Sequence, residues 1–188
     1  ERSQRDNIAR YDAAQPDSPL WQFSTMDNSR TAANARAPIF VNANKAYLPR
    51  YDQATLWIIN PEAESEAAFK LGALDLSAYG VGDGIPEMHR GVVVDGRLFL
   101  LLQGLDRNNH WQPTDAFVAI IDTTTDTEIE TIRLPVENPN AIAYDAESGL
   151  IYIQAIGGHA NDWSVPPTPA RYTGGIVTLD PQSFEVEM

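Results

Sequence analysis

The sequence has 188 residues, 43% of them hydrophobic and 21% charged, which is typical of a folded domain rather than of a disordered chain. Its formal net charge of −13 opposes binding to nucleic acids, whose phosphates would repel the chain, and to anionic membrane surfaces. It has no cysteine, which excludes disulfides and thiol chemistry, and no apolar run long enough for a membrane-spanning helix. It begins with Glu1 rather than methionine, which is compatible with the removal of an export leader.

In chain order, residues 1–34 contain two short segments, 7–12 and 20–24, that we expect to form the outer strands of a sheet. The apolar segments that follow recur in pairs around a short turn. These pairs are IFVNANKAYLP (39–49), VVVDGRLFLLL (92–102) and IAYDAESGLIYIQ (142–154). In the second pair, Asp95-Gly96 predicts a two-residue hairpin turn, because both residues tolerate the positive φ that such a turn requires.

Another kind of strand recurs four times and ends in Asp or Asn. Its copies are IARYD (8–12), LWIIN (56–60), VAIID (118–122) and IVTLD (176–180). Each copy is followed by a polar turn and a further strand. After VAIID, for example, the turn is residues 123–126 and the strand is residues 127–134. The repeating unit is therefore a four-stranded antiparallel meander.

The inner strands of this unit are apolar on both sides, so both faces of each sheet must be covered. Sheets stacked around one axis cover each other, which predicts an all-β fold, a β-propeller of four-stranded antiparallel blades. A β-sandwich is the alternative, but it would not explain the recurring four-stranded unit.

We expect a partial ring of about three and a half blades, whereas a closed ring has at least four. The expected parts are the outer strands of one blade in 1–34, complete blades in 35–84 and 85–137, and an incomplete blade in 138–188. Another chain or further blades should therefore complete the ring.

These repeats resemble those of YncE-like bacterial β-propellers with YVTN repeats. The resemblance rests on GVVVDGRLFLLLQ, FVAIIDTTTDTEIETIRL, NPNAIAYD and GGIVTLDPQSFEV, and it covers most of residues 35–188. It implies an extracytoplasmic protein of the bacterial cell envelope or exterior, in the periplasm, on the outer-membrane surface or secreted. It implies no single activity, because related propellers include lipoproteins, surface proteins, lactonases and the heavy subunits of amine dehydrogenases.

In a propeller, the loops leading into each blade and those between its second and third strands open on one face. The longest such loops are residues 79–90, 104–116 and 157–175. We expect this loop face to bind a protein or a small ligand, because loops on a rigid scaffold commonly carry binding residues. The candidate ligand-binding residues are Arg50, His89, Arg107, His110, Trp111, His159 and Trp163. The alternative is that these residues have structural roles. Each tryptophan would then pack against its own loop, and the histidines would be held by hydrogen bonds.

Calcium is the cofactor for which the sequence offers candidate ligands. Glu87, Asn138 and Asn140 lie where inner strands begin and carry the oxygens that Ca²⁺ prefers, as in propeller lactonases that this pattern resembles. The histidines lack a local ligand spacing for a transition metal. The glycines of GVGDG (80–84) lead into a strand rather than a helix, which argues against a phosphate-binding loop.

The sequence favours a non-enzymatic binding or assembly protein. The alternative is an enzyme subunit: either a calcium-dependent, lactonase-like hydrolase or the propeller subunit of a redox complex resembling the amine dehydrogenases.

Overall fold

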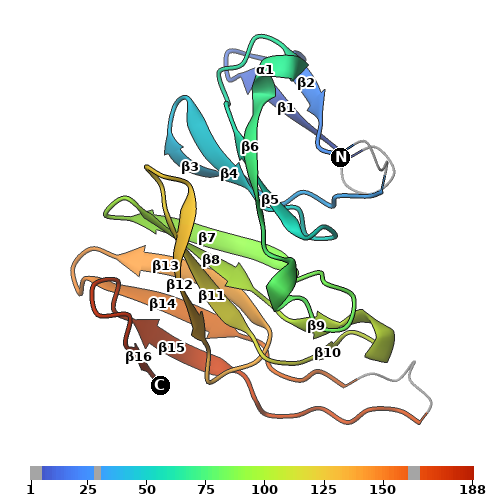
Figure 1. The fold of residues 1–188 in the computed structure, drawn as a ribbon, viewed down its shortest axis with the longest axis vertical. Coiled ribbons are helices and arrows are strands. Elements are labelled where there is room, and N and C mark those ends of the chain that lie inside the picture. The colour runs from blue at the N-terminus through green and yellow to red at the C-terminus, as the bar shows by residue number, and fades with distance from the viewer. Residues whose placement is uncertain (1–5, 28–30, 161–165) are drawn as a thin grey trace.

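The structure is a computed structural model that describes residues 6–27, 31–160 and 166–188. In these residues the chain forms three four-stranded sheets, an N-terminal hairpin and a short strand pair within a loop (Figure 1). The N-terminal hairpin joins β1 (Asn7–Asp12) to β2 (Gln15–Ser24). No described helix is long and apolar enough to cross a membrane.

The three complete sheets are antiparallel meanders whose strands follow chain order. The first sheet contains β3 (Ile39–Asn42), β4 (Lys45–Leu48), β5 (Thr55–Ile59) and β6 (Lys70–Asp75). The second contains β7 (Met88–Val94), β8 (Arg97–Leu102), β11 (Phe117–Asp122) and β12 (Thr127–Arg133). The third contains β13 (Pro139–Asp145), β14 (Leu150–Ala155), β15 (Gly175–Leu179) and the short β16 (Val186–Glu187). The four-stranded unit expected from the repeats is confirmed.

Five short elements lie outside these sheets. They are α1 (Glu66–Phe69), the 3₁₀ helices η1 (Ser77–Tyr79) and η2 (Arg107–Asn109), and the strands β9 (Leu105–Asp106) and β10 (Gln112–Pro113). The repeat pattern does not predict α1. Its buried Phe69 packs against Trp21 and Phe23 with ring centroids 5.5 and 5.4 Å apart, which joins the N-terminal hairpin to the first sheet.

The predicted hairpin turn at Asp95-Gly96 is confirmed. Val94 pairs with Arg97, and the two central residues have φ of 48° and 75°. Both values lie in the region that Gly and Asp adopt more readily than other residues.

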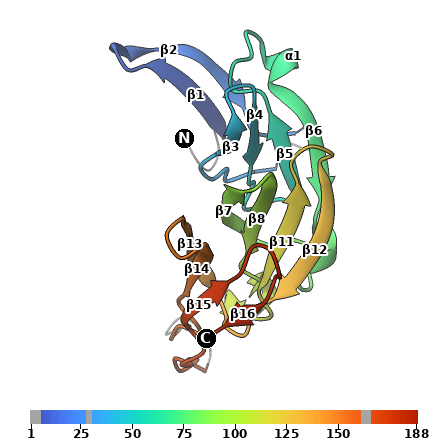
Figure 2. The ribbon, with the colours of Figure 1, turned by 90° about the vertical axis from the view of Figure 1, so that its left-hand side faces the viewer.

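The sheets stand side by side in an arc (Figure 1). Figure 2 shows the first strands β3, β7 and β13 on the concave side, and the fourth strands β6 and β12 on the convex side. First strands of neighbouring sheets touch, β3 with β7 and β7 with β13. This is the blade arrangement of a β-propeller, and the described residues form part of a ring.

The apolar core lies between the sheets, and β8 contributes to it on both faces. Leu98 and Leu100 belong to the core shared with the first sheet, whereas Phe99 and Leu101 belong to the core shared with the third. All four side chains have 0% exposure. The strand therefore needs no polar face, which explains its continuous apolar run.

The third sheet has one open face. Tyr47, Phe99 and Tyr152 occupy the same position in successive sheets, where the first two are 0% exposed and Tyr152 is 39% exposed. The first two pack against the next sheet along the chain. Tyr152 has no such neighbour in the described residues, so the arc ends here.

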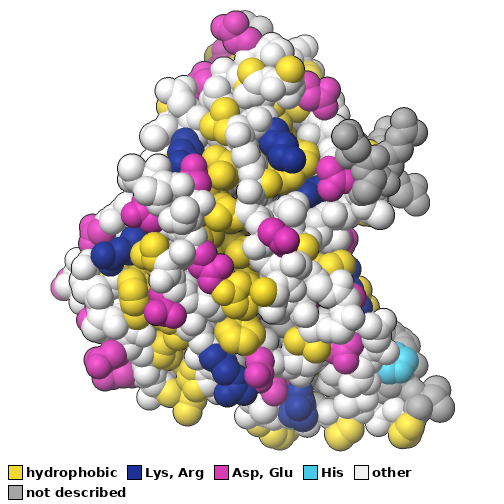
Figure 3. Space-filling view, viewed as in Figure 1, with side chains coloured by type: hydrophobic (Ala, Val, Ile, Leu, Met, Phe, Trp, Pro, Cys, Tyr) yellow, Lys and Arg dark blue, Asp and Glu magenta, His cyan; other side chains and the backbone are white. Residues whose placement is uncertain are grey.

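The acidic excess is dispersed rather than gathered into one patch on the face that Figure 1 presents. Figure 3 shows acidic and basic side chains interspersed there, with apolar side chains between them. The net charge therefore does not point to a single acidic binding surface on this face.

Candidate functional site

The loop between the second and third strands of the second sheet folds into a compact turn. Its strands β9 and β10 pair, and Asp106 caps η2 by accepting the N–H groups of Asn108 at 3.0 Å and Asn109 at 3.2 Å. His110 and Trp111 follow with φ of 54° and 61°, a left-handed conformation that reverses the chain. This turn holds η2 beside the loops of the neighbouring sheet.

Arg107 is the centre of the contacts on this loop face. Its Nε lies 2.8 Å from Glu87 Oε1, and its Nη2 lies 2.9 Å from Asp52 Oδ1. Nη2 also donates to the carbonyl of Tyr51 at 3.0 Å, and the guanidinium lies 4.5 Å from the Trp111 ring centroid. Arg107 thus ties together three loops, and three of the predicted site residues, Arg107, Trp111 and Glu87, meet here.

Glu87 is a buried carboxyl with 0% exposure. Its Oε2 accepts the N–H of Leu105 at 2.9 Å. Burial raises the pKa of Glu87 to about 7, although its bonds with Arg107 and Leu105 act in the opposite direction. Burial by itself would lower the pKa of Arg107, but its bond with Glu87 and the nearby Asp52 raise it. Glu87 is therefore a buried carboxyl whose pKa lies close to neutral pH.

A polar residue with positive φ precedes the first strand of each sheet. Asn34, Glu87 and Asn138 have φ of 48°, 49° and 55°, at spacings of 53 and 51 residues. In two sheets its carbonyl accepts the N–H that follows the second strand, from Gln103 at 3.3 Å and from Ile156 at 3.0 Å. Sequence reasoning selected Glu87 and Asn138 but missed Asn34, although the spacing was the available signal.

The loops of the second and third sheets are joined through Arg171, which Glu137 holds in place. Its Oε2 accepts from Arg171 Nη2 at 2.8 Å and from Thr173 Oγ1 at 2.7 Å. Arg171 also donates to the carbonyl of Pro113 at 2.9 Å. Sequence reasoning did not select Arg171, because nothing local marks its two partners.

Arg50 lies inside the protein rather than on the loop face. It has 0% exposure, and it donates to the carbonyl of Thr25 at 3.0 Å and to Thr55 Oγ1 at 2.7 Å. Its guanidinium lies 4.2 Å from the Trp57 ring centroid, and it pairs with Asp27 at 3.2 Å. Arg50 therefore links the end of the N-terminal hairpin to the first sheet.

The remaining aromatic and histidine candidates have separate surroundings. His89 is 9% exposed and meets Tyr51 edge-on, with ring centroids 6.1 Å apart. His110 is exposed, and His159 is half-buried next to the bridge between Gly158 and Arg171. Trp163 lies outside the described residues.

Within the described ranges, no group of three or more His, Asp or Glu side chains is placed to hold a metal ion. Both oxygens of Glu87 accept hydrogen bonds, from Arg107 and Leu105. Asn138 Oδ1 accepts from Gln103 Nε2 at 2.8 Å, and Asn140 is half-buried in β13. These contacts give Glu87 and Asn138 structural roles, and calcium binding stays a prediction.

The elevated pKa of Glu87 predicts a pH-dependent stability. The group titrates near 7 in the folded protein, against 4.5 as its ordinary value, so the folded state binds more protons between these values. Stability should then fall as the pH rises through this window, by about 3 kcal/mol in total. Urea unfolding of the wild type and Glu87→Gln from pH 5 to pH 8 checks this: the variant should lack this loss. A difference between the two proteins that does not change with pH would contradict it.

The sequence matches no protein-family model and no curated protein. Its structure, however, is similar to that of BamB from Moraxella catarrhalis, with a TM-score of 0.55 and 10% identity over 98% of this chain and 46% of that one. It is also similar to quinohemoprotein alcohol dehydrogenase from Comamonas testosteroni, with a TM-score of 0.66 and 12% identity over 100% of this chain and 32% of that one. For hydrazine synthase from Kuenenia stuttgartiensis the TM-score is 0.54, with 11% identity over 89% of this chain and 44% of that one.

At these identities the likeness concerns the fold, which is that of a β-propeller. This chain spans less than half the length of each of the three structures.

Proposed function

We propose that this chain is a portion of a larger β-propeller and serves as a binding or assembly module of the bacterial cell envelope or exterior. One observation carries the proposal. Apolar residues at equivalent strand positions are buried between sheets in the middle of the arc but exposed at its two ends. The YncE-like repeat pattern supports the extracytoplasmic location.

The open face of the third sheet is built like the covered faces of the other two. Leu56, Val118 and Ile176 occupy the same position in the third strand of successive sheets. The first two are 0% exposed, whereas Ile176 is 63% exposed. An apolar residue that repeats a core position but lies in water indicates that another sheet packs here.

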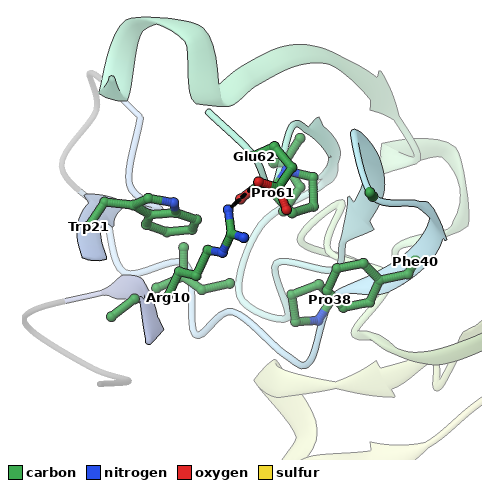
Figure 4. A pocket seen from close by; sticks show the side chains of 10 residues that line it. Arg10, Trp21, Pro38, Phe40, Pro61 and Glu62 are labelled. Atoms are coloured by element: carbon green, nitrogen blue, oxygen red, sulfur yellow. Dashed lines mark hydrogen bonds and ion pairs between the residues drawn. The ribbon is translucent and has the colours of Figure 1, made fainter. Parts of the chain in front are cut away.

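Among the described residues, the N-terminal sheet consists of two strands, β1 and β2. β1 corresponds to a third strand, but in the described residues it pairs only with β2, so its inner edge is open. A pocket of about 390 Å³ lies between β1 and β3, and Phe40 on β3 is 59% exposed beside it. Figure 4 shows Arg10 and Trp21 on one side and Phe40 and Pro38 on the other. The pocket and the open edge together fit an inner strand pair that completes this sheet.

The loop face supports a binding role. Trp111 is 41% exposed, and Arg107 lies against it while being held by Glu87 and Asp52. Aromatic residues and arginine held in a fixed geometry are enriched at the centres of protein interfaces. A second exposed aromatic residue, Tyr172, lies in the loop of the third sheet.

Sedimentation of the purified chain tests the proposal. We expect its apparent mass to rise with concentration, because the open face of the third sheet packs against another copy of the chain. Ile176→Arg should abolish this association. The matched control is Ile129→Arg, since Ile129 is 46% exposed but lies on β12, on the convex side of the arc. A chain that stays monomeric at all concentrations, or equal association in both variants, would refute the proposal.

A second candidate is the propeller portion of a redox enzyme. Two of the similar structures described above are named as enzymes, an alcohol dehydrogenase and a hydrazine synthase. The completed assembly, isolated under native conditions, distinguishes the two functions. A redox cofactor would add absorbance at wavelengths above those of Trp and Tyr, whereas a binding module would show only protein absorbance.

A further inference from the structure

A second pocket lies where the first strands of two neighbouring sheets begin. Its volume is about 300 Å³, and it is lined by Ala35, Arg36 and Ala37 before β3 and by His89 and Arg90 at the start of β7. Both strands lie on the concave side of the arc (Figure 2). The lining residues therefore lie at the starts of strands on the side of the molecule that would face the axis of a complete ring.

The side chain of Tyr51 positions two of these lining residues. The Arg36 guanidinium lies 4.0 Å from the Tyr51 ring centroid, and the His89 ring meets the same ring edge-on at 6.1 Å. Tyr51 is itself 8% exposed. Burial raises the pKa of its hydroxyl to about 12, so the ring is neutral at physiological pH. A cation stacked on a buried neutral ring has few alternative positions, which lowers the ordering cost of binding a ligand.

The charge of the pocket is opposite to that of the chain. The lining has two arginines and one histidine but no carboxylate, in a protein with a net charge of −13. Asp52 and Glu87, in the adjoining loops, pair with Arg107. Arg90 is exposed and takes no part in the ion pairs found among the described residues.

We propose that Arg36, His89 and Arg90 form a binding site for an oxyanion, the phosphate or carboxylate group of a small molecule, on the concave side of the arc. Guanidinium groups bind such anions through two parallel N–H bonds, and an imidazole N–H adds a further donor. The volume accommodates an anionic head group with a small attached body. The site adjoins the Arg107 contacts, because Arg107 donates to the carbonyl of Tyr51, but Arg107 is not among its lining residues.

Titration calorimetry tests the site, with inorganic phosphate and malonate added in separate experiments. Chloride salts keep the ionic strength constant. We expect saturable binding of at least one anion to the wild-type chain. Arg36→Gln and Arg90→Gln should each weaken that binding about tenfold or more, because each removes a charged donor. Binding of phosphate but not malonate, or the reverse, identifies the kind of oxyanion.

Arg133→Gln is the matched control, because it removes the same charge at a position outside the pocket. Arg133 is an exposed arginine at the end of β12, where it pairs with Asp115. It should leave binding unchanged. Arg90→Gln keeps the test decisive if Arg36→Gln impairs folding, since Arg90 is exposed. The proposal is overturned if neither anion binds saturably, or if Arg90→Gln and Arg133→Gln weaken binding equally.

Discussion

Replacing Arg107 by methionine should lower the free energy of unfolding by about 3–5 kcal/mol at pH 8. The change leaves Glu87, which has 0% exposure, as a buried carboxylate without its 2.8 Å partner. It also removes the bonds to Asp52 and to the Tyr51 carbonyl. The loss should be smaller at pH 5, where Glu87 is protonated in the folded protein. Urea unfolding followed by circular dichroism at both pH values measures it.

Two further variants show whether the buried charge is the cause. Arg133→Met breaks an ion pair with Asp115 in which the side chains of Arg133 and Asp115 are 66% and 55% exposed. It should lower the free energy of unfolding by less than about 1 kcal/mol. Combining Glu87→Gln with Arg107→Met should restore part of the stability, because no buried charge then remains unpaired. Equal losses at Arg107 and Arg133, or no recovery in the double variant, would show that Glu87 does not depend on Arg107.

Phe99→Ala should destabilise the protein by about 3–5 kcal/mol, whereas Tyr152→Ala, at the same position of the next sheet, should cost less than about 1 kcal/mol in the isolated chain. Phe99 has 0% exposure and belongs to the core between the second and third sheets, so its removal leaves a cavity. Tyr152 is 39% exposed on the open face. Thermal and urea unfolding of the two variants give the comparison directly.

Once the ring is completed, the same pair of variants should behave alike. A sheet packed on Tyr152 would give it the surroundings that Phe99 has, and Tyr152→Ala would then weaken the assembly. A large loss of stability for Tyr152→Ala in the monomeric chain would mean that its face is already covered.

The fold could be predicted because its information is local and repeated. Asp95-Gly96 specifies a tight turn by its own backbone preference. The continuous apolar runs on both sides of this turn indicate strands that are buried on both faces. Repetition then identifies which strands belong to one sheet. Helix α1 was missed because it interrupts the repeat once, and its Phe69 is explained only by the aromatic rings of the N-terminal hairpin.

For the candidate site, the sequence predicted which loops carry the selected residues but not the contacts that these residues make. The repeat placed Glu87 in a loop that leads into a sheet, and Arg107 and Trp111 in a loop between two strands, but it did not predict that Arg107 contacts both of the others. The burial of Arg50 could not be predicted either, because it depends on the carbonyl of Thr25, just after β2, and on packing against Trp57. Contacts of this kind join residues far apart in the chain, and no spacing within a single sequence reveals them.

The open inner edge of β1 also bears on the tendency of the chain to add strands from other molecules. An unpaired strand edge is a template on which strands of other molecules can add without limit. The register of β1 against β2 shifts at Arg10/Tyr11 and again at Tyr11/Asp12, with the extra residues in β2, so the pairing is irregular near the C-terminal end of β1. Such irregular pairing increases the local twist of the hairpin, and a twisted edge is a poorer template for flat strand addition.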